Sequence, residues 1–338
     1  MQSLAVKYRP ATFEDIVGQE SIVKILKKQV EEDKIRNVYL FCGASGCGKT
    51  TASRAFASMI NNGQGSPIEI DAASNNGVDN VRDIVASAQE RAIDSKYKVY
   101  ILDECHVFSN SAWNAFLKCI EEPPTYTIFI FCTTDPQKIP ATILNRVQRF
   151  NFTRIKSGLI EKRLRYVCEK EGFTDFDAGI EYISKISGGC MRDALTNLDK
   201  CCALSTDITV ENVLYALGNF SYECMFKIVN HVIDGKEAEV LQDISDVYDS
   251  GADLKIFIDQ FLSFCLDITK YILTKDCSIL TIPSSYEEEL KKTINFKDAD
   301  KYYAYIIDNL IQLKNDIKND MNLKDTVEIR FLKLARCS

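Results

Sequence analysis

The feature that most constrains this chain is a glycine-rich loop between a strand-like and a helix-like segment. The loop is Gly43-Ala44-Ser45-Gly46-Cys47-Gly48-Lys49-Thr50. An apolar run over 38–42 precedes it, and the residues from Thr51 onward continue as a helix. In this order the pattern G-x-x-x-x-G-K-[ST] predicts a phosphate-binding loop. Backbone N–H groups and the helix N-terminus would surround phosphate oxygens, Lys49 would reach the outer phosphates, and the Thr50 hydroxyl could ligate Mg²⁺.

Segments of strand and helix character alternate over residues 37–152, which predicts an α/β fold with a parallel sheet and helices on both faces. The predicted strands are 38–42, 68–71, 99–103, 127–133 and 147–152, and the predicted helices between them are 49–61, 77–92, 109–121 and 141–145. From residue 157 onward the pattern is entirely helical. We therefore expect an α/β domain over 1–155, a small helical domain over 156–218 and a second helical domain over 219–338.

Composition and charge narrow the class of protein further. Of the 338 residues, 46% are hydrophobic and 26% are charged, as in a soluble globular protein. Neither a signal peptide nor an apolar stretch of membrane length occurs, so we expect a cytoplasmic protein without a membrane partner. The net charge is −7, of which −6 falls in residues 219–338. Any contact with nucleic acid is therefore expected in the N-terminal part.

Thirteen cysteines raise the question of zinc or disulfides. Their spacing includes no C-x-x-C pair, which argues against a zinc site. Most lie in apolar runs, where cysteine behaves as a small hydrophobic residue. We expect reduced thiols.

A second chemical signal follows a predicted strand. The apolar run 99–102 ends in Asp103 and Glu104. Asp103 is suited to hold Mg²⁺ directly or through water. Glu104 is suited to orient and deprotonate an attacking water. Because kinases with the same loop transfer phosphate to a substrate group, the second acid favours hydrolysis.

Several further motifs occur in a fixed order along the chain. They are Lys7-Tyr8-Arg9-Pro10, Phe13, Val17-Gly18-Gln19, the glycine loop, Glu69-Ile70-Asp71-Ala72-Ala73-Ser74, Asp103-Glu104-Cys105-His106, Glu121-Glu122-Pro123-Pro124, Thr133-Thr134-Asp135-Pro136-Gln137-Lys138 and Gly189-Cys190-Met191-Arg192-Asp193-Ala194-Leu195. This set resembles the bacterial clamp-loader ATPases, the gamma/tau subunits of DNA polymerase III, within the AAA+ superfamily. A weaker match continues over 327–335, so the resemblance covers essentially the whole chain.

The resemblance implies an AAA+ ATPase core over 1–155, a helical lid over 156–218 and a helical collar over 219–338 that oligomerises. It also implies roles for particular residues. Tyr8, Val17 and Thr51 would join the glycine loop in binding ATP. Thr134 resembles the sensor 1 residue near the γ-phosphate, and Arg192 resembles sensor 2, which reaches the nucleotide from the lid.

Arg146 occupies the place where this family has Ser-Arg-Cys, whose arginine inserts into the neighbouring subunit's site. A guanidinium supplied in this way can accelerate phosphoryl transfer by about 10³–10⁵. Here Asn145 and Val147 replace the flanking serine and cysteine.

The resemblance also implies partners. These are other clamp-loader subunits in a ring of about five, the sliding clamp and primer-template DNA. The helix that opens near Asn76, Gly77, Val78 and Arg82 lies where clamp loaders track the duplex backbone, a contact that carries no sequence information. The same run, Asn75-Asn76-Gly77, fits equally well a turn followed by a helix cap.

The chain departs from the family in two respects. Where the family usually inserts a four-cysteine zinc module, only residues 61–66 bridge the gap, so we expect ATP and Mg²⁺ but no zinc. The sequence also stops at Ser338, which predicts a minimal, gamma-like form without the long tail of tau.

Two alternative functions remain open. A recombination or fork-maintenance AAA+ motor would act on branched DNA. A nucleotide-binding scaffold would not hydrolyse ATP, although intact Lys49, Asp103 and Glu104 argue against it.

Overall fold

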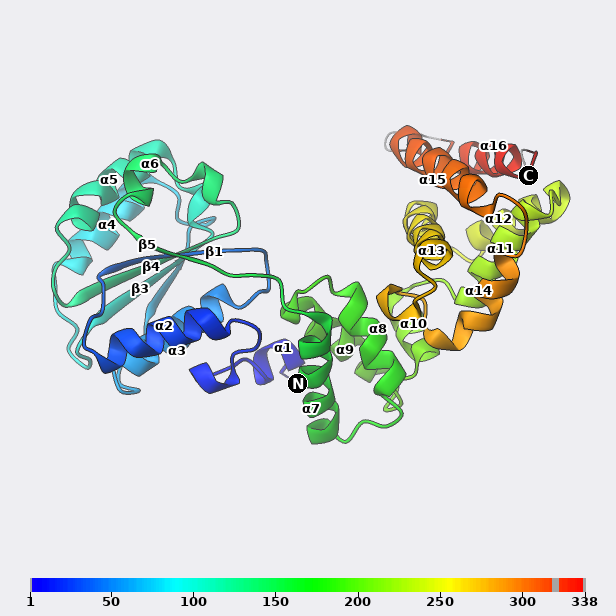
Figure 1. The fold of residues 1–338 in the computed structure, drawn as a ribbon. Coiled ribbons are helices and arrows are strands. Elements are labelled where there is room, and N and C mark those ends of the chain that lie inside the picture. Colours follow the sequence, from blue (N-terminus) through cyan, green and yellow to red (C-terminus); the bar gives the residue numbers. More distant parts are fainter. Residues whose placement is uncertain (1, 318–321, 337–338) are drawn as a thin grey trace. The chain divides into compact units, whose positions relative to one another are not determined.

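The computed structural model of the protein describes residues 2–317 and 322–336. Residues 2–167 and 187–199 form one compact unit, and residues 168–186, 200–317 and 322–336 form a second. Figure 1 shows a sheet flanked by helices in the N-terminal part of the chain and helices alone in the C-terminal part. The α/β fold class is confirmed, and the division into three domains stays a prediction.

The first unit is built on a five-stranded sheet in the order β2-β3-β4-β1-β5, and every neighbouring pair is parallel. The strands are β1 (Val38–Cys42), β2 (Ile68–Asp71), β3 (Lys98–Asp103), β4 (Thr127–Thr133) and β5 (Gln148–Asn151). Three have the predicted bounds, β3 starts one residue earlier, and β5 is one residue shorter at each end. Strands β1 and β4 are buried throughout, which explains their continuous apolar sequence.

Helices cover both faces of this sheet (Figure 1). The helices of this part of the chain are α1 (Leu4–Lys7), which lies away from the sheet, α2 (Glu20–Glu31), α3 (Lys49–Ile60), α4 (Val78–Ala88), α5 (Asn110–Glu121) and α6 (Ala141–Leu144). Its 3₁₀ turns are η1 (Phe13–Asp15), η2 (Cys105–Val107) and η3 (Pro136–Lys138). Helix α2 was not among the predicted helices. Helix α4 ends four residues earlier than predicted.

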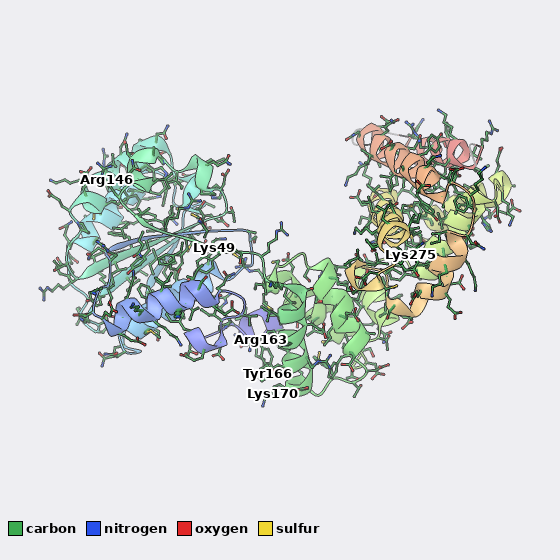
Figure 2. All side chains as sticks on the ribbon, in the orientation of Figure 1. Lys49, Arg146, Arg163, Tyr166, Lys170 and Lys275 are labelled. Carbon is green, nitrogen blue, oxygen red and sulfur yellow. The ribbon has the colours of Figure 1, made fainter. Side chains whose placement is uncertain are left out.

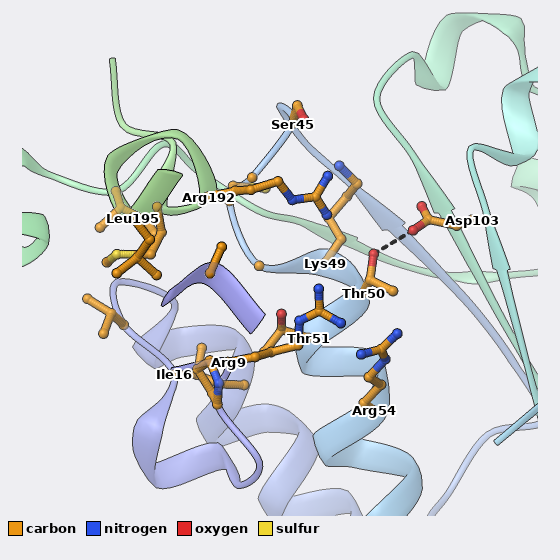
Figure 3. Close-up of a pocket in the computed structure, with 18 of the residues that line it drawn as sticks. Arg9, Ile16, Ser45, Lys49, Thr50, Thr51, Arg54, Asp103, Arg192 and Leu195 are labelled. Carbon is orange, nitrogen blue, oxygen red and sulfur yellow. Dashed lines mark hydrogen bonds between the residues drawn. The ribbon is translucent and has the colours of Figure 1, made fainter. Parts of the chain in front are cut away.

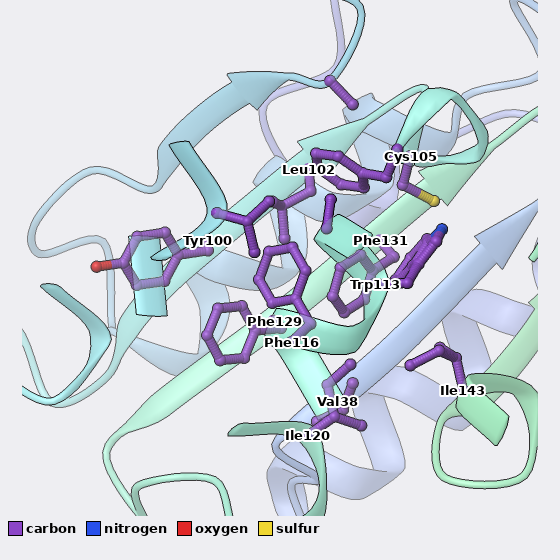
Figure 4. Packing of buried hydrophobic residues seen from close by; sticks show 14 of the residues in the cluster. Val38, Tyr100, Leu102, Cys105, Trp113, Phe116, Ile120, Phe129, Phe131 and Ile143 are labelled. Carbon is purple, nitrogen blue, oxygen red and sulfur yellow. The ribbon is translucent and has the colours of Figure 1, made fainter. Parts of the chain in front are cut away.

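Alternate residues of each strand point to opposite faces, so the unit has two apolar layers. In one layer α2 and α3 pack on Tyr39 and Phe41 of β1. In the other, shown in Figure 4, Trp113 and Phe116 of α5 pack on the strands. The Trp113 ring centroid lies 5.3 Å from that of Phe131. These layers hold the strand ends, and the loops that follow them, in fixed positions.

The remaining described chain is helical. Its elements are α7 (Ser157–Glu171), α8 (Asp177–Ile186), α9 (Met191–Leu204), α10 (Val210–Leu217), α11 (Tyr222–Ile233), α12 (Glu237–Asp249), α13 (Leu254–Thr274), η4 (Cys277–Ile279), η5 (Ser284–Tyr286), α14 (Glu287–Thr293), α15 (Ala299–Asp316) and α16 (Leu323–Arg336). Helix α13 buries the stripe that contains Leu254, Phe257 and Phe261, as its three-four spacing predicts. No helix of the described ranges has both the length and the hydrophobicity that a transmembrane span requires.

Candidate nucleotide-binding site

The candidate site lies at the carboxyl edge of the sheet. The glycine loop follows β1, the pair Asp103 and Glu104 lies at the end of β3, and Thr134 follows β4. The glycine loop follows β1 and the acids follow β3, and one strand, β4, lies between these two in the sheet. The loop and the acids line a pocket of about 370 Å³ (Figure 3). The predicted residues that line it are Tyr8, Val17, Ser45, Gly46, Cys47, Gly48, Lys49, Thr50, Thr51, Asp103, Glu104 and Arg192.

Two glycines of the loop occupy positions that a side chain could not share. Gly46 has φ +64°, and a Cβ added there would lie 2.0 Å from Cys190 Sγ. A Cβ on Gly43 would lie 2.5 Å from the Phe152 carbonyl oxygen. The Gly46 carbonyl also accepts a hydrogen bond from the Met191 N–H at 3.1 Å. The loop is therefore packed directly against the segment that carries Arg192.

The loop leads into α3, whose N-terminus offers donors to an anion. Gly48 is the N-cap residue with φ +102°, and no side chain caps this helix end. The first N–H groups of a helix without a side-chain cap are suited to bind phosphate oxygens. Lys49 is 5% exposed, and its Nζ donates to the carbonyl oxygens of Gly43 at 2.9 Å and Ala44 at 3.0 Å. The folded chain thus fixes this ammonium group beside the loop.

A hydroxyl and a carboxylate converge beside Lys49. The Thr50 hydroxyl donates to Asp103 Oδ2 at 2.6 Å, as Figure 3 shows. The other oxygen of Asp103 accepts from the Glu104 N–H at 2.9 Å. Oxygen donors of these two kinds fit Mg²⁺, which prefers carboxylate, hydroxyl and water ligands.

Glu104 has an uncommon backbone conformation, and two neighbouring side chains orient its carboxylate. It has φ +47°, an uncommon conformation for a residue with a side chain. Its Oε2 accepts a hydrogen bond from the Thr134 hydroxyl at 3.0 Å. The same oxygen lies 3.3 Å from His106 Nδ1, without the angles of a hydrogen bond. Both contacts are made to Oε2, so they orient the carboxylate and leave Oε1 for other partners.

Four arginines from different elements line this pocket: Arg9, Arg54, Arg163 and Arg192. Figure 3 labels three of them, Arg9, Arg54 and Arg192. Arg192 was predicted, whereas Arg9, Arg54 and Arg163 were not assigned to the site. Burial, followed by the neighbouring Arg54 and Arg192 guanidinium groups, lowers the pKa of Arg9, and Glu69 opposes this shift. Arg54 pairs with Glu69. Accumulated positive charge of this kind suits a polyanion such as a nucleoside triphosphate.

Two of the unassigned arginines, Arg9 and Arg54, gave signals in the sequence. Arg9 belongs to the Lys7-Tyr8-Arg9-Pro10 motif that carried the resemblance. Arg54 lies four residues after Thr50, on the same face of α3.

A further contact of the glycine loop is made by Gln19, which belongs to the Val17-Gly18-Gln19 motif but was not assigned to the site. Gln19 is 3% exposed. Its side-chain amide donates to the carbonyl oxygens of Cys47 at 3.2 Å and Thr153 at 2.8 Å, and its oxygen accepts from the Thr153 N–H at 3.3 Å. This side chain joins the N-terminal segment, the loop and the residues after β5.

Arg146 lies outside the pocket. It follows α6 and precedes β5, at the edge of the sheet where the strands begin. In the register of β5 against β1 it is level with residue 37, six residues before the loop starts at Gly43. At about 3.3 Å per residue these levels are separated by about 20 Å. Figure 2 shows Arg146 and Lys49 well apart, so Arg146 cannot act on a nucleotide held by its own loop.

The predicted DNA-contacting residues lie at the start of α4. Asn76, Gly77 and Arg82 are exposed, and Val78 is half-buried. Gly77 is the N-cap residue of α4. Arg82 pairs with Asp79 at 2.9 Å, and these side chains are 68% and 86% exposed. Gly77 thus precedes the first turn of α4 without a side-chain cap. The contact of this segment with DNA stays a prediction.

The twelve described cysteines are free thiols, and Cys337 lies outside the described residues. Burial raises the pKa of the Cys47 thiol in the glycine loop, although the nearby Lys49 opposes this shift. Over residues 2–317 and 322–336, no three histidine, cysteine or acidic side chains are grouped to hold a metal ion. The expected absence of zinc stays a prediction.

The parallel sheet, the glycine loop after β1 and the paired acids after β3 define an AAA+ P-loop fold. RuvB from Thermotoga maritima, described as a Holliday junction branch migration motor, shares this fold. The structures align with a TM-score of 0.52 and 18% identity, over 67% of this chain and 80% of RuvB. A point mutant of the same RuvB gives a TM-score of 0.53, also at 18% identity. At this level of identity the likeness concerns the fold.

Sequence comparisons define the family. The model "DNA polymerase III, delta subunit" matches residues 68–156, and "DNA polymerase III subunits gamma and tau domain III" matches residues 208–336. DNA polymerase III subunit tau of Bacillus subtilis is 38% identical over 80% of this chain and 52% of its own length. The gamma/tau subunit of Mycoplasma genitalium is 32% identical over 95% of this chain and 57% of its own length. The chain belongs to the DNA polymerase III gamma/tau family, as the motif order predicted, and spans about half the length of the curated relatives it matches.

Proposed function

We propose that this protein is an ATP-hydrolysing subunit of a DNA polymerase sliding-clamp loader, acting in the cytoplasm during replication. ATP binding would close a ring of subunits around an open clamp, and primed DNA would trigger hydrolysis and release. Its partners would be other loader subunits, the sliding clamp and primer-template DNA. Membership of the gamma/tau family supports this proposal.

One observation carries the hydrolytic part of the proposal. The pairs Thr50–Asp103 and Thr134–Glu104 are both formed beside the glycine loop. The first pair offers oxygen ligands, and the second holds a carboxylate that can take a proton. A scaffold that only binds nucleotide would not need the second pair.

Each residue of the pocket has a role in this mechanism. The N–H groups of the loop and of α3 would bind the phosphates, and Lys49 would exchange its carbonyl partners for phosphate oxygens. Thr50 and Asp103 would hold Mg²⁺, which neutralises phosphate charge when bound. Glu104 would accept the proton of the attacking water at Oε1 while Thr134 holds Oε2. Arg192, on the segment bonded to the loop, would contact the phosphates from the lid.

Arg146 would act in trans. Hydrolysis builds negative charge on the γ-phosphoryl oxygens, and a guanidinium group stabilises that charge through its fixed fork of donors. Its place at the opposite edge of the sheet excludes action on its own nucleotide and supports action on a neighbour's. The site in one subunit would then be complete only after assembly.

The second candidate is a branch-migration motor, which the likeness to RuvB brings into consideration. The likeness of fold does not favour it. The match of residues 208–336 to gamma and tau domain III favours the clamp loader. The two candidates differ in their DNA substrate, which is a primer-template for one and a four-way junction for the other.

The decisive experiment measures ATP hydrolysis by the complex assembled with its clamp, with primer-template or junction DNA added. We expect stimulation by the clamp and primer-template together. Stimulation by junction DNA instead would support the motor, and no stimulation by either DNA would refute both proposals.

Glu104→Gln tests the catalytic base in the same complex. We expect normal ATP binding and a loss of hydrolysis of about 10²–10⁴-fold, the usual contribution of a general base. Gln keeps the size of the side chain and its contact with Thr134, so folding should be unchanged. Hydrolysis at the wild-type rate would remove Glu104 from the role of base.

A further inference from the structure

The Arg146 guanidinium has a defined partner within its own subunit. One terminal nitrogen lies 2.7 Å from Glu121 Oε1, and the other donates to the Thr142 carbonyl oxygen at 2.6 Å. The Arg146 and Glu121 side chains are 38% and 47% exposed. The side chain is therefore oriented by two acceptors before any neighbour is present.

The fold brings these two residues together from distant parts of the sequence. Glu121 is the last residue of α5, and Arg146 follows α6, which packs beside α5 through the apolar layer that contains Phe116 and Ile143. A carboxylate at a helix C-terminus faces the negative end of the helix dipole and is stabilised by a nearby cation. Arg146 supplies that cation.

The two lysines of the surrounding groove pair with a different acid. The groove has a volume of about 700 Å³ and includes Lys28, Lys34 and Glu32. Lys28 and Lys34 lie 3.6 Å and 2.9 Å from the Glu32 carboxylate. Among the described residues of the groove, Glu121 is thus the acid that pairs with Arg146.

We propose that Glu121 is the positioning residue for Arg146: it holds the guanidinium in the groove of its own subunit and releases it when a neighbouring subunit presents a γ-phosphate. This proposal rests on the proposed trans role of Arg146. The γ-phosphate competes with the Glu121 carboxylate for the same donors. After hydrolysis and loss of phosphate, Arg146 returns to Glu121.

The direction of the exchange follows from the strength of the two pairs. An ion pair between exposed side chains is weak because water and salt screen it. An arginine–phosphate pair formed at a closed interface, from which water is excluded, is stronger and frequently bidentate. Glu121 therefore delays engagement without preventing it.

The test uses Glu121→Gln in the assembled complex, with ATP hydrolysis measured in the absence of clamp and DNA. Gln removes the negative charge and keeps the size of the side chain. We expect a two- to fivefold rise in this basal rate, equivalent to about 0.4–1 kcal/mol at 1.4 kcal/mol per tenfold change. Glu32→Gln is the matched control, because Glu32 lies in the same groove and pairs with lysines; we expect no change.

A double-mutant cycle separates this inference from the proposed function. In the Arg146→Ala background, Glu121→Gln should have no effect. If Arg146→Ala leaves hydrolysis by a neighbour unchanged, the trans role is wrong. The trans role of Arg146 can hold while the positioning role of Glu121 is wrong. That is the conclusion if Glu121→Gln leaves the basal rate unchanged or lowers it, or if it raises the rate equally in the Arg146→Ala background. Glu121→Ala repeats the measurement with the carboxylate removed altogether.

Discussion

Replacing Gln19 with methionine is expected to destabilise the nucleotide-binding unit and weaken ATP binding. Gln19 is buried and makes three hydrogen bonds, to the Cys47 carbonyl and to both backbone groups of Thr153. Methionine has a similar volume and shape, so the substitution removes the hydrogen bonds while leaving little cavity.

The magnitude follows from these bonds. A hydrogen bond inside a protein contributes about 0.5–1.5 kcal/mol net, and a buried group that loses its partner costs more. Three bonds give an expected loss of about 2–4 kcal/mol in the free energy of unfolding. The single bond to the Cys47 carbonyl, which orients the glycine loop, corresponds to about a fivefold weaker ATP affinity if it contributes about 1 kcal/mol.

The chain contains a convenient probe for this measurement. Trp113 is its single tryptophan, lies in α5 of the first unit and is 1% exposed. Its fluorescence during urea titration therefore follows unfolding of this unit rather than of the helical one. ATP affinity is measured separately by equilibrium binding. The exposed Gln64→Met serves as the control and should change stability by less than about 0.5 kcal/mol.

Two results would contradict this reasoning. If Gln19→Met unfolds at the same urea concentration as the wild type, the three hydrogen bonds do not stabilise the unit. If stability falls but ATP affinity is unchanged, Gln19 supports the fold without orienting the loop.

Three further predictions concern the same unit. Gly46→Ala should weaken ATP binding and lower the free energy of unfolding by about 1–3 kcal/mol, because the new Cβ would meet Cys190 Sγ at a positive φ. The control is Gly158→Ala in α7, where a Cβ would meet open space. Equal effects of the two substitutions would contradict the prediction. Arg192→Ala should weaken binding of ATP more than of ADP in equilibrium titrations, and equal weakening would exclude a γ-phosphate contact. Burial raises the pKa of the Cys105 and Cys132 thiols above the ordinary value of 9.0. Because the unfolded chain therefore binds fewer protons above about pH 9, the free energy of unfolding should fall there by up to about 1.4 kcal/mol per pH unit per thiol. An unchanged urea midpoint of the Trp113 signal between pH 8 and 10 would contradict this prediction.

The sequence predicted the elements of the first unit well because their signals are local. Strands β1, β2 and β4 have the predicted bounds. For β1 and β4 the reason is that a buried parallel strand needs a continuous apolar run. The loop and the acids at Asp103 and Glu104 were recognisable because phosphate binding and metal binding require particular residues at fixed spacing. Helix α2, which is amphipathic but carries no catalytic motif, was not predicted.

The sequence by itself therefore determined the residues of the proposed chemistry: the glycine loop, the acid pair, Arg146 and Arg192. The tertiary structure decided which of these groups meet. The contacts of Gln19 with Thr153 and of Thr50 with Asp103 join residues 134 and 53 positions apart, and the pair of Arg146 with Glu121 joins two separate helix ends. Such contacts depend on the strand order β2-β3-β4-β1-β5, which differs from the order along the chain. Local periodicity fixes where strands and helices form, but only packing of the two apolar layers fixes their neighbours, and with them the geometry of the glycine loop.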